Sequence, residues 1–107
     1  MSSLRAPQSL LNRLNLESGE AVFNYEVMAE QAASLGRMGH KAEAALAALK
    51  AHDAKDGSEG RAVVLKAAVD AVWCFLVQRE VMGLRDRAQI VVQYEIPREV
   101  MLRLGAR

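Results

Sequence analysis

The sequence has few of the residue types from which covalent, catalytic and nucleic-acid-binding sites are built. Its 107 residues include one cysteine, two prolines and two histidines, and its 14 basic and 13 acidic residues form no block of one sign. A single cysteine cannot form an internal disulfide. Nucleic-acid-binding proteins usually carry a basic stripe that neutralises phosphates. This chain has no such stripe, so we do not expect nucleic acid as its partner.

No stretch of the sequence predicts a membrane segment or a secretion signal. The longest apolar run, Ala71–Val77, is far shorter than the roughly 20 residues that cross a bilayer. The N-terminus lacks the charged region and following apolar run of a signal peptide. We therefore expect a cytoplasmic protein with no membrane partner.

What the sequence has in abundance is alanine, with 51% apolar and 25% charged residues, as in an ordinary globular domain. Much alanine and few aromatic residues favour closely packed helices over a β-sandwich. We predict an all-α fold: a small helical bundle with a long central helix, an antiparallel helical hairpin and two short C-terminal helices. Residues 1–18 are expected to form a flexible N-terminal arm, and residues 19–107 a single helical domain.

The N-terminal arm contains Pro7 and a short amphipathic pattern, with Ser9 as a candidate N-cap. Its leucines, which need a surface to cover, are Leu10, Leu11 and Leu14.

The hairpin is predicted from two apolar stripes separated by glycines. The first helix should span about residues 20–35 and the second about residues 40–53, with Gly36 and Gly39 breaking the chain between them. Steps of three and four residues mark one buried face on each helix. The stripe residues are Ala21, Tyr25, Met28, Ala32 and Leu35 in the first helix, and Ala42, Ala45, Leu46 and Leu49 in the second.

The central helix is expected over about residues 59–82, after a loop at residues 54–60. Ser58 is a candidate N-cap for it. A polar stripe, with Trp73 and Val77 on it, solvates the start of this helix, whereas its second half is apolar all round and should be enclosed. Cys74, in that second half, should be a small buried hydrophobe.

Two short helices should follow. Gly83 ends the central helix, and Asp86 can cap a helix over residues 87–93, with Gln89 completing a capping box. Pro97 at a first helical position starts the last helix, which ends at Leu104.

Arg79 lies in line with the apolar face of the central helix, so its charge requires a carboxylate or solvent. We predict a structural ion-pair cluster in which Arg79 and the nearby Arg85 meet Glu26 and Glu30 of the first helix.

The sequence predicts neither catalysis nor a metal site. A di-iron bundle needs Glu-x-x-His pairs, and neither His40 nor His52 lies three residues after a glutamate. A buried Cys74 would be a poor nucleophile. We therefore expect no enzyme activity, no catalytic residues, no metal and no cofactor.

Three segments have the most individual character: YEVMAEQAASLGRMG, VWCFLVQREVMGLRD and YEIPREVMLRLG. They resemble a family of short, uncharacterised bacterial proteins, mostly alphaproteobacterial, described as a domain of unknown function. The resemblance covers the chain from about Gly19 onward. It implies a compact all-helical domain, and it assigns no activity, ligand or catalytic residue.

Three functions remain open. The first is a protein-interaction or structural module that forms a homodimer through Phe23, Val27, Trp73 and Val77. The second is a DNA-binding regulator with a helix-turn-helix-like unit at Arg87–Leu104, although Glu95 stands where glycine is usual and Glu99 lies at the reading end. The third is a helical bundle that binds a small molecule in a pocket lined by Tyr25, Met28, Trp73 and Phe75.

Overall fold

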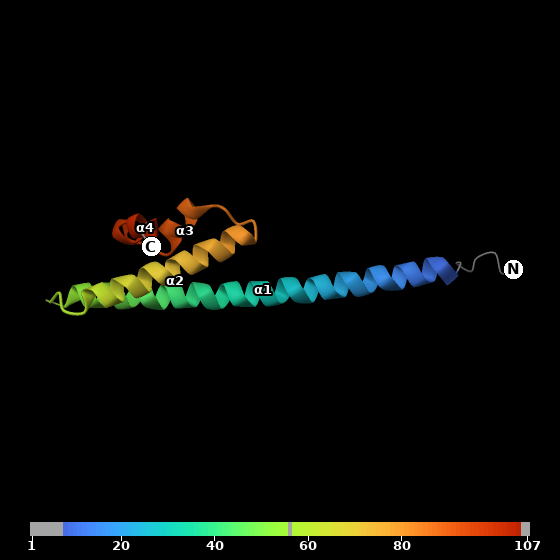
Figure 1. The fold of residues 1–107 in the computed structure, drawn as a ribbon, viewed down its shortest axis with the longest axis horizontal. Helices are drawn as coiled ribbons and strands as arrows, with labels where there is room; N and C mark the ends of the chain where they lie inside the picture. The colour runs from blue at the N-terminus through green and yellow to red at the C-terminus, as the bar shows by residue number, and fades with distance from the viewer. Residues whose placement is uncertain (1–7, 56, 106–107) are drawn as a thin grey trace. The chain divides into compact units, whose positions relative to one another are not determined.

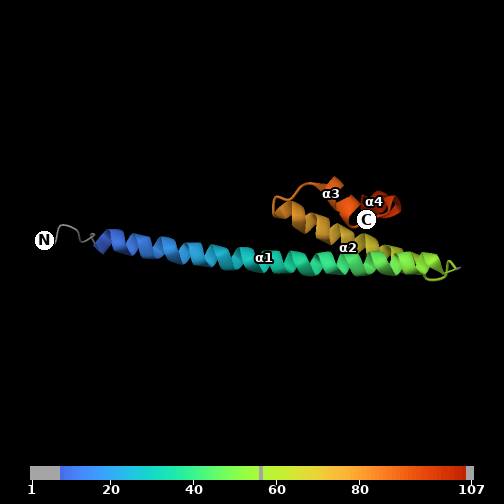
Figure 2. The ribbon, with the colours of Figure 1, turned by 180° about the vertical axis from the view of Figure 1, so that it is seen from behind.

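The computed structural model of the chain describes residues 8–55 and 57–105, apart from the side chains of residues 8, 10, 11 and 13–17. The described residues form four helices and no strand: α1 (Gln8–Ala54), α2 (Arg61–Val81), α3 (Arg87–Gln93) and α4 (Arg98–Leu104). Figures 1 and 2 show these helices from opposite sides. The predicted all-α class is confirmed.

α1 is one helix of 47 residues, so the predicted break at Gly36 and Gly39 is wrong. Neither glycine has a positive φ, and both continue the helix. The apolar stripe keeps its steps of four and three through them, at Leu35, Gly39, Ala42, Leu46 and Leu49. Gly39 is buried, and a Cβ there would lie 3.0 Å from Tyr94 Oη and 3.2 Å from Phe75 Cε1. This glycine therefore allows close packing and does not end a helix.

α1 begins at Gln8, so Ser9 lies inside the helix and does not cap it. Residues 1–7 of the predicted arm, and the side chains of Leu10, Leu11 and Leu14, lie outside the described residues. The chain divides into two compact units, Met1–Ala33 and Ser34–Arg107. The predicted boundary between arm and domain, at residues 18 and 19, stays a prediction.

The core of the second unit lies where the C-terminal part of α1 meets α2, α3 and α4. A helical hairpin is formed here by residues 34–54 of α1 and the returning α2 (Figure 1). The predicted hairpin of residues 20–35 and 40–53 is wrong, because both segments belong to α1. Val72, Leu76 and Val100 are the largest fully buried side chains. The buried cluster comprises Ala42, Leu46, Leu49, Leu65, Ala68, Val69, Ala71, Val72, Phe75, Leu76, Ile90, Ile96, Val100 and Leu104.

Individual residues account for the helix ends, although the predicted N-cap Ser58 is wrong. Gly60, at φ 78°, occupies the N-cap of α2, and Ser58 does not cap it, because the helix begins two residues later than expected. Gly83 follows α2 at φ 85° in the left-handed region that glycine favours. Asp86 accepts a hydrogen bond from Gln89 N at 3.1 Å, as predicted.

The turn between α3 and α4 contains one unusual residue. Glu95 has φ 51°, in the left-handed region where a non-glycine residue is strained. Pro97 is the N-cap of α4 and not its first helical residue, so the helix begins at Arg98, one residue later than predicted. Its fixed φ of −63° and extended ψ of 147° end the turn and start the helix.

α2 is not enclosed along its second half, contrary to the prediction. Trp73 is 38% exposed, Val81 is 73% exposed, and Cys74 is exposed as well. The buried face runs through Ala68, Val72 and Phe75, and residues 73 and 74 turn to the other side because the helix advances 100° per residue. Cys74 is therefore not a core residue.

Candidate functional site

The first unit presents an exposed apolar surface. Every side chain described in residues 8–33 is exposed, and its large apolar members include Phe23 at 64%, Tyr25 at 74% and Met28 at 65%. When residues are placed at 100° intervals around the helix axis, one group of apolar side chains covers an arc of roughly 140° of the circumference. This arc is wider than the usual core-facing stripe. We call this group the apolar face of α1; it consists of Ala21, Val22, Tyr25, Met28, Ala29, Ala32 and Ala33.

The charged side chains described in this unit lie outside the apolar face. Glu20, Glu26 and Glu30 occupy the remaining part of the helix circumference, together with Phe23 and Val27. Residues 14–36 contain four glutamates and no lysine or arginine. Residues 18–33 therefore combine an uncharged apolar face with an acidic back.

The apolar face continues a stripe that is buried elsewhere in the same helix. Ala21, Tyr25, Met28 and Ala32 precede Leu35 in steps of four and three, in phase with Ala42, Leu46 and Leu49. Those last three side chains are buried in the core of the second unit. One stripe is thus covered in residues 34–54 and exposed in residues 18–33.

The predicted oligomer contacts are accessible in both units. Phe23 and Val27 are exposed in the first unit. Trp73 is exposed and Val77 half-buried in the second unit. Their joining into one dimer surface stays a prediction.

The predicted cluster of Arg79, Arg85, Glu26 and Glu30 also divides between the two units, and it stays a prediction. Within the second unit, the Arg79 guanidinium lies over the Phe75 ring, with 5.8 Å from Cζ to the ring centroid. This contact accounts for the alignment of Arg79 with the apolar face, because a guanidinium is attracted to an aromatic face. Arg85 contributes to lowering the pKa of Glu80 through its charge, after the larger effects of Arg87.

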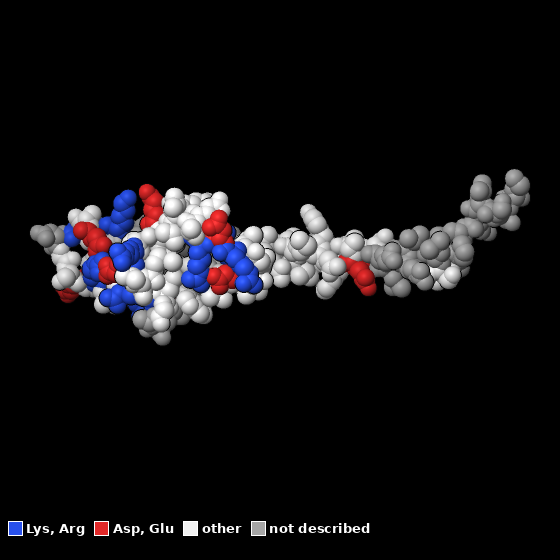
Figure 3. Space-filling view, turned by 90° about the horizontal axis from the view of Figure 1, so that it is seen from above, with Lys and Arg blue, Asp and Glu red and all other residues white. Residues whose placement is uncertain are grey.

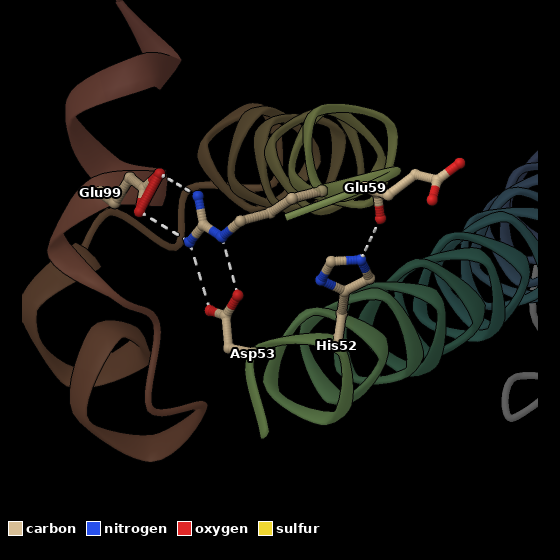
Figure 4. A network of polar contacts seen from close by, with 5 residues as sticks. His52, Asp53, Glu59 and Glu99 are labelled. Carbon is tan, nitrogen blue, oxygen red and sulfur yellow. Dashed lines mark hydrogen bonds and ion pairs between the residues drawn. The ribbon is translucent and has the colours of Figure 1, made fainter. Parts of the chain in front are cut away.

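The strongest polar arrangement in the second unit was not predicted: Arg61 binds two carboxylates at once (Figure 4). Arg61 Nε and Nη2 donate to Asp53 Oδ1 and Oδ2 at 2.7 and 3.2 Å. Arg61 Nη1 and Nη2 donate to Glu99 Oε1 and Oε2 at 2.8 and 3.0 Å. The planar guanidinium suits such paired contacts. It ties the end of α1, the start of α2 and the start of α4, and we call it the arginine latch.

The latch shifts the ionisation of its members. The hydrogen bonds from Arg61 hold the pKa of Asp53 and the pKa of Glu99 below their ordinary values. Hydrogen bonds to Glu99 and Asp53 raise the pKa of Arg61. All three side chains remain about one-third or more accessible to solvent, so their electrostatic interaction is screened by water.

His52 closes the loop beside the latch. Its Nε2 lies 2.7 Å from the Glu59 carbonyl oxygen, which fits donation from a ring N–H (Figure 4). The sequence contained one signal for this region: Asp53 and Arg61 carry opposite charges on the two sides of a short loop. Glu99, 38 residues beyond Arg61, gave no such signal.

The predicted ligand pocket also involves both units and stays a prediction. Phe75 itself is 3% exposed and packs on Tyr94, with ring centroids 5.1 Å apart. The described part of the second unit contains grooves. One, of about 570 Å³, lies between residues 43–53 of α1 and residues 93–97; a smaller one, of about 270 Å³, includes Met38, Lys41 and Cys74.

The helix-turn-helix-like unit has the predicted helices but uses its apolar residues for the core. Ile90, Ile96 and Leu104 are buried. Arg87 Nε donates to Glu80 Oε1 at 2.6 Å, and Glu99 is bound by Arg61. Figure 3 shows basic and acidic side chains interspersed on the visible face of the second unit. The described part of the visible face therefore has no basic stripe. DNA binding stays a prediction.

Two further features bear on ligands. Within residues 8–55 and 57–105, no group of three or more histidine, cysteine or acidic side chains could hold a metal ion. His40 and Glu43, which share a helix face, are exposed, with 3.8 Å between Nδ1 and Oε2. Nor is any helix of the described chain both long and apolar enough to cross a membrane.

Comparison with known proteins places the chain in a family without assigning a function. The chain matches no curated protein and no solved structure. A model of a family of unknown function, DUF6665, matches residues 1–107, which agrees with the resemblance seen in the sequence. The chain therefore belongs to this family of unknown function.

Proposed function

We propose that the protein is a non-enzymatic interaction module that assembles with further copies of itself through the apolar face of α1. The observation that carries the proposal is the exposure of Val22, Tyr25 and Met28 on one side of a helix whose stripe is buried further along. A continuous apolar stripe on a helix usually marks the side that packs against another element.

The energetics favour a covered face. An isolated helical segment is only marginally stable in water, and most helix stability comes from packing an apolar side. Complete burial of a valine or methionine side chain contributes about 1.5–3 kcal/mol. Two copies would each bury three large side chains, against an association cost of about 4–15 kcal/mol. Because the two sums are similar, each of these side chains should affect the affinity measurably.

Sedimentation velocity over a wide concentration range tests the proposal. The parent protein should sediment as an oligomer that dissociates on dilution. A Tyr25→Glu/Met28→Glu variant should remain monomeric at concentrations where the parent associates, because burying a carboxylate at a helix interface is costly. The matched control is Val63→Glu, which places a charge on an equally exposed apolar residue of α2, at 74% exposure.

The control should associate like the parent. A parent protein that is monomeric at every concentration contradicts the proposal. So does a double variant that associates as strongly as the parent.

A further inference from the structure

Within residues 18–28 of α1, one stripe of exposed side chains is asymmetric in size along the helix. Its positions, in steps of three and four, carry the small residues Ser18 and Ala21 toward the N-terminus and the large residues Tyr25 and Met28 toward the C-terminus. All four side chains are exposed. In a well-packed interface large side chains face small ones, so this difference in size determines how two copies fit.

The two possible alignments differ in how they use the gradient. Parallel, in-register helices place each stripe residue beside its own copy, so Tyr25 meets Tyr25 and Ser18 meets Ser18. That alignment crowds one layer and leaves another empty. Antiparallel helices crossing at the level of residue 23 place Tyr25 against Ala21 and Met28 against Ser18. Each large side chain then faces a small one.

The antiparallel alignment also suits the flanks of the stripe. The residues beside the crossing point are Val22 on one side and Asn24 on the other, and neither is charged. Glu20, Glu26 and Glu30 lie outside the apolar face. Pairing of residues 18–28 therefore buries neither Glu20 nor Glu26 and sets no like charges directly opposite each other at the crossing point.

Resting on the proposed function, we propose that residues 18–28 of two copies pair as antiparallel helices about a two-fold axis at the level of residue 23. Tyr25 packs against the partner's Ala21, and Met28 packs against the partner's Ser18. The interface is isologous, because each copy contributes the same segment.

Single-cysteine variants in a Cys74→Ser background distinguish the alignments, since the native thiol is exposed and would otherwise react. In the antiparallel pair, Asn24→Cys places the thiols of the two copies close to the two-fold axis and on the same side of the interface. Ala32→Cys places them about 27 Å apart along the antiparallel helices, 18 residues at 1.5 Å each, but side by side in a parallel pair. Residues 24 and 32 are both exposed, so both variants should fold, as circular dichroism would verify.

A short bismaleimide added to each associated variant should link Asn24→Cys into a covalent dimer and leave Ala32→Cys unlinked. A mixture of Ser18→Cys, carrying a mass tag, and Met28→Cys should give the mixed dimer in excess over either homodimer. Linking of Ala32→Cys, or of neither variant in a sample that sediments as an oligomer, overturns the antiparallel pairing and leaves self-association intact. A protein that sediments only as a monomer overturns both proposals.

Discussion

The guanidinium of Arg61 spans the carboxylate of Glu99, with Nη1 to Oε1 at 2.8 Å and Nη2 to Oε2 at 3.0 Å. The two residues are 38 positions apart, at the starts of α2 and α4. The same guanidinium binds Asp53 at the end of α1. One side chain thus fixes the ends of three helices at the loop side of the second unit.

The first prediction concerns this latch at neutral pH. Glu99→Gln replaces a charged, paired acceptor with a neutral amide, so the free energy of unfolding should fall, although modestly, because the site is partly solvated. In an Arg61→Gln background the same change should have little effect. Urea denaturation of the four proteins of this double-mutant cycle measures the coupling. A Glu99→Gln effect of the same size in both backgrounds would show that the latch does not stabilise the fold.

The second prediction concerns acid stability. The pKa values of Asp53 and Glu99 lie below their ordinary values of 3.8 and 4.5 because Arg61 hydrogen-bonds both carboxylates. The unfolded chain therefore binds more protons in this range than the folded chain. The stabilisation should be complete above about pH 5 and lost as the pH falls through the lowered pKa values.

Asp53→Asn/Glu99→Gln should accordingly be less stable than the parent at pH 7 and should lose less stability between pH 5 and pH 2. Denaturation midpoints across this range provide the measurement. Parallel curves for the two proteins would contradict the prediction. Glu80, whose pKa Arg87 lowers, should continue to contribute to the slope in both proteins.

The sequence predicts those parts of the fold that depend on neighbouring residues. Gly83, Asp86 and Pro97 each impose a local backbone preference, and α2, α3 and α4 end or begin beside them. The all-α class followed from composition and from helical periodicity, which depend little on tertiary contacts.

The errors arise where glycine has two opposite uses. A glycine between apolar stripes predicts a helix end, whereas Gly39 gives room for Phe75 and Tyr94. The unbroken phase from Leu35 to Leu49 was the signal that could have identified a single helix. No comparable signal located Cys74, because the rotation of α2 about its axis depends on what α1 and α4 cover.

The arginine latch was missed for a related reason. Asp53 and Arg61 lie close in sequence on either side of a loop, but Glu99 joins them only because α4 packs on α2. Such tertiary contacts are not encoded in local spacing. By contrast, the exposed Phe23 and Val27 could be anticipated, because a helix with apolar residues on two sides cannot bury both against one neighbour.

The third prediction separates the two glycines of α1. A Cβ at Gly36 meets nothing within 4 Å, so Gly36→Ala should stabilise the protein by about 0.5–1 kcal/mol through helix propensity alone. Gly39→Ala gains the same propensity but crowds Tyr94 and Phe75, and overpacking costs about 1–3 kcal/mol. Gly39→Ala should therefore be clearly less stable than Gly36→Ala in thermal denaturation. Equal stabilisation by both changes would mean that the packing at Gly39 relaxes freely.

The fourth prediction concerns the salt dependence of self-association. Residues 14–36 contain four glutamates and no basic residue, so two paired copies of this segment repel each other through their acidic backs. Salt screens repulsion between exposed charges, with a Debye length of about 10 Å at 0.1 M and about 3 Å at 1 M. Raising sodium chloride from about 0.05 to about 0.5 M increases the ionic strength about tenfold and shortens the Debye length. The dimer should therefore become stronger, as sedimentation equilibrium would measure.

Glu20→Gln/Glu26→Gln should associate more tightly than the parent at low salt and show a weaker salt dependence, because two of the repelling charges per copy are gone. Weakening of the dimer by salt would point instead to attraction between opposite charges. The apolar face would then dock on a basic surface, and the pairing of two acidic segments would be wrong. The sign of the salt effect thus decides which part of a second copy covers Tyr25 and Met28.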